Sequence, residues 1–179
     1  MPDKDSRNLQ HPVWNVYDQL RTSRLNILYY SAKLKFSERL QLIMQLILAA
    51  AVPSSAVAGF KIWDFWLGKY AWEIFVSLSS FVAFIQPFIG LQKKIKKLDE
   101  LVVGYKILYF DLIDIKHKIE NDQKYGPAHK KIFKAALDRR KKLEIKETGL
   151  WENNSLRKKC QEIVKNELPA KYFYIPEEV

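Results

Sequence analysis

Polar side chains interrupt two long apolar stretches of this chain, and they are the residues whose types and spacing could do chemistry. The stretches run over Leu40–Phe60 and Tyr70–Leu91. In the second, a carboxylate and two hydroxyls recur at helical spacing and therefore share one helix face. In lipid, such a face needs protein or water opposite it. We call this set the polar stripe: Gln41, Gln45, Glu73, Ser77, Ser80 and Gln86.

The polar stripe allows two interpretations. In an oligomer it would line a polar path through the membrane. Alternatively, each hydroxyl bonds back to a carbonyl of its own helix, and the glutamines simply lie near the membrane surface. The second interpretation predicts that leucine at Ser77 and Ser80 leaves activity intact.

The two apolar stretches are long enough to cross a bilayer. A helix of 1.5 Å per residue over either stretch is about 30 Å long, the thickness of the hydrocarbon core. Tryptophans gather around the connecting turn, and lysines and arginines flank the outer ends, which places both termini in the cytoplasm. The alternative is two buried helices of a soluble bundle. The flanking residues are Trp63, Trp66, Tyr70 and Trp72 at the turn, and Lys33, Lys35, Arg39, Lys93, Lys94, Lys96 and Lys97 at the outer ends.

Small residues recur at every fourth position on two faces of the first span, which lets another helix approach closely. That neighbour is either the second span of the same chain or a second copy, and the spacing favours neither. One face carries Ala50, Ser54 and Ala58, and the other carries Ala51, Ser55 and Gly59.

Apolar residues at helical spacing continue on both sides of the hairpin, so we predict an all-α membrane protein. The long helix after the second span should pack antiparallel to the N-terminal helix and hold copies together. Its expected assembly face is Ile95, Leu98, Val102, Tyr105, Tyr109 and Leu112. The expected parts are a disordered tail (1–11), a cytoplasmic helix (12–39) continuous with the first span (40–60), an external turn (61–69), the second span (70–91), a long cytoplasmic helix (92–122), C-terminal helices (127–168) with Ser155 as a cap, and a tail (169–179).

Composition and motifs exclude several classes of protein. The chain has 179 residues and a net charge of +10, which would suit a nucleic-acid binder. Its basic runs Arg139–Lys142 and Arg157–Lys159, however, lack regularly spaced stacking aromatics. No signal peptide, phosphate-cradling loop, nucleophile elbow or zinc signature is visible, and Cys160 is alone. We therefore expect no enzyme, cofactor, metal or nucleic-acid partner.

The segment Val13–Arg39 followed by a hairpin and a helical tail resembles the SLATT family. These are two-transmembrane effector domains associated with SMODS nucleotidyltransferases and SLOG sensors in bacteria. The likeness covers about residues 12–169, and the matching positions are Trp14, Tyr17, Arg24, Asn26, Tyr30, Glu38 and Arg39.

The resemblance implies a multi-pass protein of the bacterial inner membrane that acts in antiphage defence. Such an effector oligomerises and perforates or depolarises the membrane, causing growth arrest or cell death. We expect no sensor domain in this chain, so it would depend on an upstream sensor or a nucleotide-signal synthase encoded by neighbouring genes. The alternatives are a non-conducting anchor or scaffold that recruits a cytosolic partner through its basic helices, and a membrane-tethered nucleic-acid binder.

Overall fold

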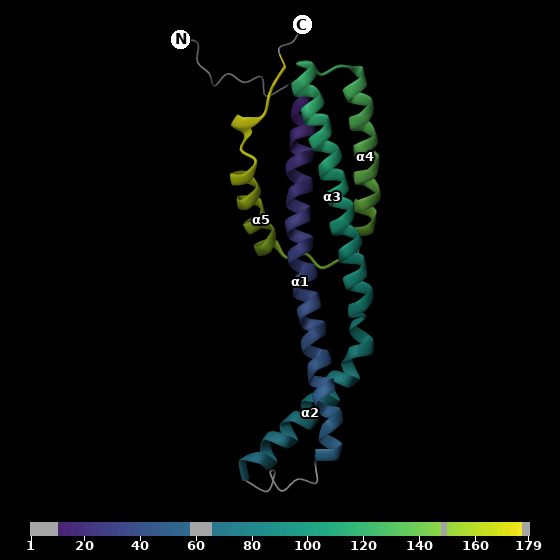
Figure 1. The fold of residues 1–179 in the computed structure, drawn as a ribbon, viewed down its shortest axis with the longest axis vertical. Helices are drawn as coiled ribbons and strands as arrows, with labels where there is room; N and C mark the ends of the chain where they lie inside the picture. Colours follow the sequence, from purple (N-terminus) through teal and green to yellow (C-terminus); the bar gives the residue numbers. More distant parts are fainter. Residues whose placement is uncertain (1–10, 58–65, 148–149, 177–179) are drawn as a thin grey trace. The chain divides into compact units, whose positions relative to one another are not determined.

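The structure of this chain is a computed structural model that describes residues 11–57, 66–147 and 150–176, without the side chains at 50–57, 66–69, 71, 72 and 87–89. Within those ranges the chain is all-helical and has no strand, which confirms the all-α class (Figure 1). The elements are α1 (Val13–Val57), α2 (Trp66–Ile89), α3 (Leu91–Asp122), α4 (Pro127–Glu147), α5 (Asn154–Glu167) and the short 3-10 helix η2 (Ala170–Tyr172).

The first helix begins where the sequence predicts but is anchored by a residue assigned to the tail. Pro12 precedes the first helical residue, and the backbone N–H of Val13 donates to Nδ1 of His11 over 3.1 Å. His11 is buried and so does not belong to the expected tail, whose other residues lie outside the described ranges. The imidazole does here what a serine or aspartate cap usually does, which is to accept from an N–H that the helix leaves unpaired. The helix then runs through the 39/40 boundary without a break.

The chain divides into two compact units. Unit 1 comprises residues 1–32 and 97–179, and unit 2 comprises residues 33–96. In unit 1, α3 lies beside α1, with α4 beside α3 and α5 beside α1 (Figure 1). The rings of Tyr30 and Tyr105 stack with centroids 5.9 Å apart and planes 12° apart. The pairing of α1 with α3 agrees with the predicted packing.

The core of unit 1 follows a heptad along α3, but its seam is shifted from the expected face. Ile95 and Tyr109 are only half-buried, whereas the second apolar row of the helix is almost fully buried. Since Leu98, Val102, Tyr105 and Leu112 are also buried within the chain, four of the six residues of the expected assembly face are intramolecular core and are not available to another copy in this arrangement. The seam of α3 comprises Leu98, Leu101, Tyr105, Leu108, Leu112, Ile115 and Ile119.

The remaining helices of unit 1 dock through small or buried residues. Gly104 lets α4 come close, because a Cβ there would overlap the side chain of Leu143. Helix α5 is capped by Asn153, whose Oδ1 accepts from the N–H of Leu156 over 3.0 Å. The expected cap at Ser155 is therefore wrong. Asparagine and serine cap equally well, and the asparagine comes first in the chain.

In unit 2 the expected turn and second span both have different limits. Helix α2 starts at Trp66, inside the predicted turn at 61–69, and stops at Ile89, before the predicted end at Leu91. Gly90 separates α2 from α3 and has φ +56, a left-handed conformation that favours glycine. The chain therefore breaks at the end of the second apolar stretch instead of continuing directly into the long helix.

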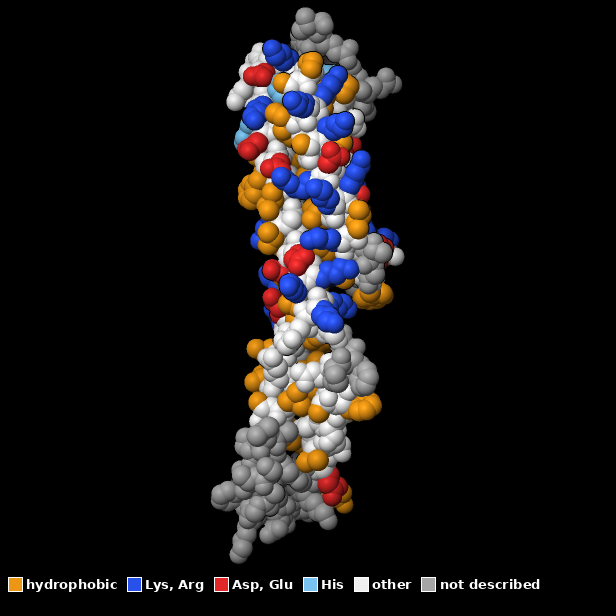
Figure 2. All heavy atoms as spheres, turned by 90° about the vertical axis from the view of Figure 1, so that its right-hand side faces the viewer, with side chains coloured by type: hydrophobic (Ala, Val, Ile, Leu, Met, Phe, Trp, Pro, Cys, Tyr) orange, Lys and Arg blue, Asp and Glu red, His pale blue; other side chains and the backbone are white. Residues whose placement is uncertain are grey.

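Large apolar side chains cover the outside of unit 2. Ten of them expose between 42% and 69% of their surface. Figure 2 shows a group of apolar side chains in orange in the lower half of the view, with few charged side chains among them. These exposed residues are Phe36, Leu42, Ile43, Leu46, Tyr70, Ile74, Val76, Leu78, Phe81 and Phe84.

Within the described ranges, the helices meet the criteria for a membrane span only in part. No single helix there meets the length and hydropathy of a span. The segment Glu73–Gln86 and helix α3 meet them only when taken together across their bent break.

Candidate functional site

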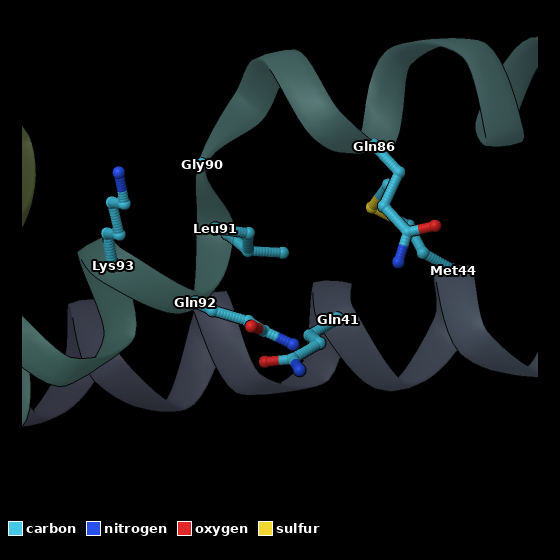
Figure 3. A pocket seen from close by; sticks show the side chains of 7 residues that line it. All are labelled: Gln41, Met44, Gln86, Gly90, Leu91, Gln92 and Lys93. Carbon is cyan, nitrogen blue, oxygen red and sulfur yellow. The ribbon is translucent and has the colours of Figure 1, made fainter.

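Unit 2 contains a cavity of about 350 Å³ where α1 passes the break between α2 and α3. Gln41 and Gln92 extend toward one another from facing helices, and Gln86 lies beside Met44 (Figure 3). Lys93 is on the side of the cavity away from Gln86. The wall therefore combines carboxamides with apolar surface, while the Lys93 side chain points away from Gln41 and Gln92. The lining residues are Gln41, Met44, Gln86, Gly90, Leu91, Gln92 and Lys93.

The structure brings together only part of the polar stripe. Gln41 and Gln86 line the same cavity. Gln45, Glu73, Ser77 and Ser80 are exposed on unit 2 and do not line this cavity. The Ser80 hydroxyl donates to the carbonyl of Val76 over 2.8 Å, which is the back-bonding of the alternative interpretation. Ser80 thus follows that alternative, while the role of Ser77 and Glu73 stays a prediction.

Two functional features of unit 2 were missed by sequence reasoning. Gln92 and Lys93 complete the cavity wall, but a glutamine and a lysine on a charged helix look like solvated residues. Ser79, which is adjacent to the polar stripe in sequence but was not assigned to it, is buried, and its Oγ has no hydrogen-bond partner among the described atoms. The signal that would have found the first pair was the isolated Gly90 just before them.

The small-residue faces of the first span lie outside what the structure describes. Ala50, Ala51, Ser54 and Ser55 belong to α1 without described side chains, and the predictions for Ala58 and Gly59 fall on undescribed residues. Of the aromatic residues around the turn, Tyr70 is described and is 61% exposed.

In unit 1, residues that carry the resemblance to the SLATT family hold the C-terminal part of the chain. The Tyr17 ring stacks on Phe173 at 4.3 Å, and Trp14 meets Phe173 edge-on at 6.3 Å. The Tyr17 hydroxyl donates to the carbonyl of Tyr174 over 2.5 Å. Phe173 and Pro176 are buried, so the expected tail at 169–179 is a docked segment as far as residue 176.

Arg24 holds α5 to α1 through a two-pronged ion pair. Its Nε and one terminal nitrogen donate to the two carboxylate oxygens of Glu167 over 2.7 and 3.1 Å. This hydrogen bonding lowers the pKa of Glu167 and raises the pKa of Arg24. The pair fixes the C-terminal end of α5 against the part of α1 that belongs to unit 1.

A tyrosine cluster fills the space between α1, α3 and the end of α4. Tyr105 donates to Glu147, and Tyr30 stacks on Tyr105. Burial raises the pKa of both hydroxyls, and the Glu147 carboxylate raises each pKa further. Asn26 also bonds to Tyr105 and partly opposes the rise in its pKa. The cluster joins three helices through neutral phenols and one carboxylate.

The basic runs of the C-terminal helices are largely occupied by acidic neighbours. Arg139 pairs with Asp111, and Arg140 bonds both Glu144 and Gln19. Lys141 lies 3.8 Å from Asp138, and Arg157 lies 3.7 Å from Glu152. Each of these side chains therefore pairs with another residue of unit 1.

The described residues hold no group of three or more His, Cys, Asp or Glu placed to bind a metal ion. Comparison of this chain with protein-family models, with curated proteins and with solved structures finds no significant match.

Proposed function

We propose that this chain is a membrane effector that inserts through unit 2, oligomerises, and permeabilises the bacterial inner membrane when an upstream signal acts on unit 1. The observation that carries the proposal is the outer surface of unit 2. Ten large apolar side chains with 42–69% exposure gather on residues 36–84, far more than the scattered single residues of an ordinary soluble surface. Contact with lipid would remove this surface from water.

The distribution of basic residues supports insertion of unit 2 as a hairpin. Lys33, Lys35 and Arg39 precede the apolar part of α1, and Lys93, Lys94 and Lys96 follow the break after α2. All six belong to unit 2. Basic residues at both outer ends of a hairpin favour cytoplasmic termini. The inner membrane would then hold the hairpin, with unit 1 in the cytoplasm.

Oligomerisation is required because two helices cannot enclose water. With the seam of α3 buried in the chain, another face of that helix is available for contact between copies. Val103, Ile107 and Phe110 follow one another at spacings of four and three residues and are 48%, 47% and 63% exposed. We call these three residues the α3 outer stripe and propose that copies meet there.

The helices provide a physical route from signal to membrane. Helices α1 and α3 each contribute residues to both units. A partner that changes how α5 or the C-terminal segment docks on α1 would therefore act on a helix that also forms the hairpin. The proposed trigger is a sensor protein or a nucleotide signal made by neighbouring genes, and the chain itself performs no catalysis and needs no cofactor.

Membrane potential in bacteria, followed with a potential-sensitive dye, tests the proposal. We expect expression with the genomic neighbours under activating conditions to collapse the potential, and Ser77→Leu with Glu73→Leu to relieve the collapse. Val76→Leu with Leu78→Val is the control, since it changes exposed apolar residues of the same helix without changing polarity. A properly inserted protein that leaves the potential unchanged under activation would instead indicate the non-conducting scaffold.

A further inference from the structure

The cavity at the break between α2 and α3 has a lining that changes character along its length. Gln86 and Met44 lie at one side, and Lys93 lies at the other, with its side chain directed away from Gln41 and Gln92 (Figure 3). Between them, the carboxamides of Gln41 and Gln92 face each other beside the apolar Leu91. A ligand that fits this wall has an apolar end and several oxygen atoms.

The break itself creates the space. Gly90 adopts φ +56, and a Cβ added there would meet nothing within 4 Å, so packing does not fill the corner. After this bend, Gln92 and Lys93 belong to the first turn of α3, where backbone N–H groups lack helical partners. The carboxamides can donate through nitrogen and accept through oxygen. They therefore suit a group that carries both acceptor oxygens and hydroxyls.

The surroundings favour a negatively charged ligand. Within unit 2, Lys94 and Lys96 are exposed on the same helix as Lys93, and Arg39 is exposed on α1 two residues before Gln41. Just beyond Gln41, α1 carries the apolar side chains of Leu42 and Ile43 at 58% and 52% exposure. The cavity thus lies where a basic segment meets an apolar one, as expected of the level of lipid headgroups.

We propose that this cavity binds the glycerol-phosphate region of an anionic phospholipid from the cytoplasmic leaflet. The flexible Lys93 side chain turns toward the cavity to take the phosphate charge, Gln41 and Gln92 bond the phosphate and glycerol oxygens, and Met44 contacts the start of an acyl chain. The inference rests on the proposed insertion of unit 2 in the membrane. It adds a lipid-binding site of defined composition to that function.

Lipid retention by the purified full chain tests this site. The protein in a non-ionic detergent is mixed with phosphatidylglycerol or with phosphatidylcholine, and the bound lipid is counted by mass spectrometry of the intact complex. We expect preferential retention of phosphatidylglycerol, which Lys93→Gln and Gln41→Leu each weaken about five-fold. Lys94→Gln and Gln45→Leu are the matched controls, since each makes the same change one or four residues away and outside the cavity, and they should change retention less than about two-fold.

Three results would overturn the proposal. Equal retention of the two lipids would mean that the headgroup charge does not contribute to recognition. Equal effects of Lys93→Gln and Lys94→Gln would mean diffuse attraction to lysines and no site. Displacement of the lipid by millimolar glycerol phosphate would identify a soluble phosphate as the ligand. The first and third results need no variant, so they hold even if a variant misfolds.

A separate measurement on cells distinguishes failure of this inference from failure of the proposed function. Alkaline carbonate extraction of cells reports whether the wild-type chain is inserted in the membrane. An inserted protein without lipid preference refutes the cavity assignment alone. A protein absent from the membrane fraction refutes the function, whatever lipid it binds in detergent.

Discussion

The phenol ring of Tyr17 lies parallel to the ring of Phe173, with 4.3 Å between centroids and 9° between planes. This contact joins the first helix to a segment more than 150 residues later in the chain, and a hydrogen bond from the Tyr17 hydroxyl to the Tyr174 carbonyl accompanies it. Tyr17 is fully buried beneath this segment. The C-terminal segment is therefore part of the core of unit 1.

Phe173→Ala should open the start of α1. Truncating a buried phenylalanine costs about 3 kcal/mol, which corresponds to roughly a hundred-fold faster amide exchange where the loss is local. Hydrogen exchange of residues 13–20 measures it. Tyr172→Ala is the control, since Tyr172 is 67% exposed in the same segment. Equal exchange in the wild type and the Phe173 variant would mean that the segment does not stabilise α1.

The cap of α5 distinguishes two neighbouring polar residues. Asn153→Ala should destabilise docking of α5 by about 1 kcal/mol, because the N–H of Leu156 loses its acceptor. Ser155→Ala should be close to neutral, since Ser155 already lies inside the helix. Thermal unfolding of the two variants gives the comparison. A larger loss from Ser155→Ala would contradict the cap assignment.

The helices of unit 1 were largely predictable because their signal is local and periodic. Apolar residues along Val13–Arg39 and along α3 recur at helical spacing without an intervening proline, which is enough to predict two long helices that pack together. Pro127 marks the start of α4 for an equally local reason, since its ring suits the first helical position.

The candidate site was predictable only in part. Gln41 and Gln86 stood out as polar residues in apolar stretches, and the cavity includes both. Gln92, which also lines the cavity, did not stand out in the sequence. Its place in the cavity depends on the bend at Gly90, and a single glycine gives too little signal to predict that bend. Contacts such as Tyr17 with Phe173 leave no pattern at all, since residues so far apart share no local periodicity.

Acid should weaken the attachment of α5. The hydrogen bond from Arg24 lowers the pKa of Glu167 in the folded chain. The pair therefore stabilises the folded chain fully above the unfolded pKa of about 4.3, and this stabilisation is lost as the pH falls through the lower, folded pKa. Because both side chains are partly exposed, the contribution is about 0.5 kcal/mol. Amide exchange of α5 as a function of pH measures it, and Glu167→Gln should remove this pH dependence below a pH of about 4.3. An unchanged profile in that variant would exclude the pair as its source.

Alkali should unfold unit 1 through its tyrosines. Burial raises the pKa of Tyr17, Tyr30 and Tyr105 in the folded chain. Each neutral phenol therefore contributes its full stabilisation of the folded state below the unfolded pKa of about 10, and this stabilisation is lost as the pH rises toward the folded pKa. We expect phenolate absorbance to appear together with loss of helical circular dichroism. Glu147→Gln keeps a hydrogen-bond acceptor but removes the charge, so the pKa of Tyr105 should move down. Titration of all tyrosines near a pH of about 10 with intact helices would show that the cluster is open to solvent.

The α3 outer stripe should decide whether copies assemble. It lies on the face of α3 opposite the buried seam, and three apolar side chains over two turns are a small contact in solution. Insertion in one membrane raises the effective concentration of copies and aligns them, so that a small contact suffices. Ile107→Ser with Phe110→Ser should therefore reduce cross-linked oligomers in membranes without changing the amount of inserted protein.

Ile145→Ser is the matched control for the outer stripe, because Ile145 is 74% exposed on α4 and lies outside the stripe. Equal cross-linking in the wild type and the double variant would move the contact between copies to unit 2. Loss of oligomers together with loss of the potential collapse would tie the assembly on α3 to permeabilisation. Loss of oligomers with the collapse retained would refute the proposal that assembly through the outer stripe is needed for permeabilisation.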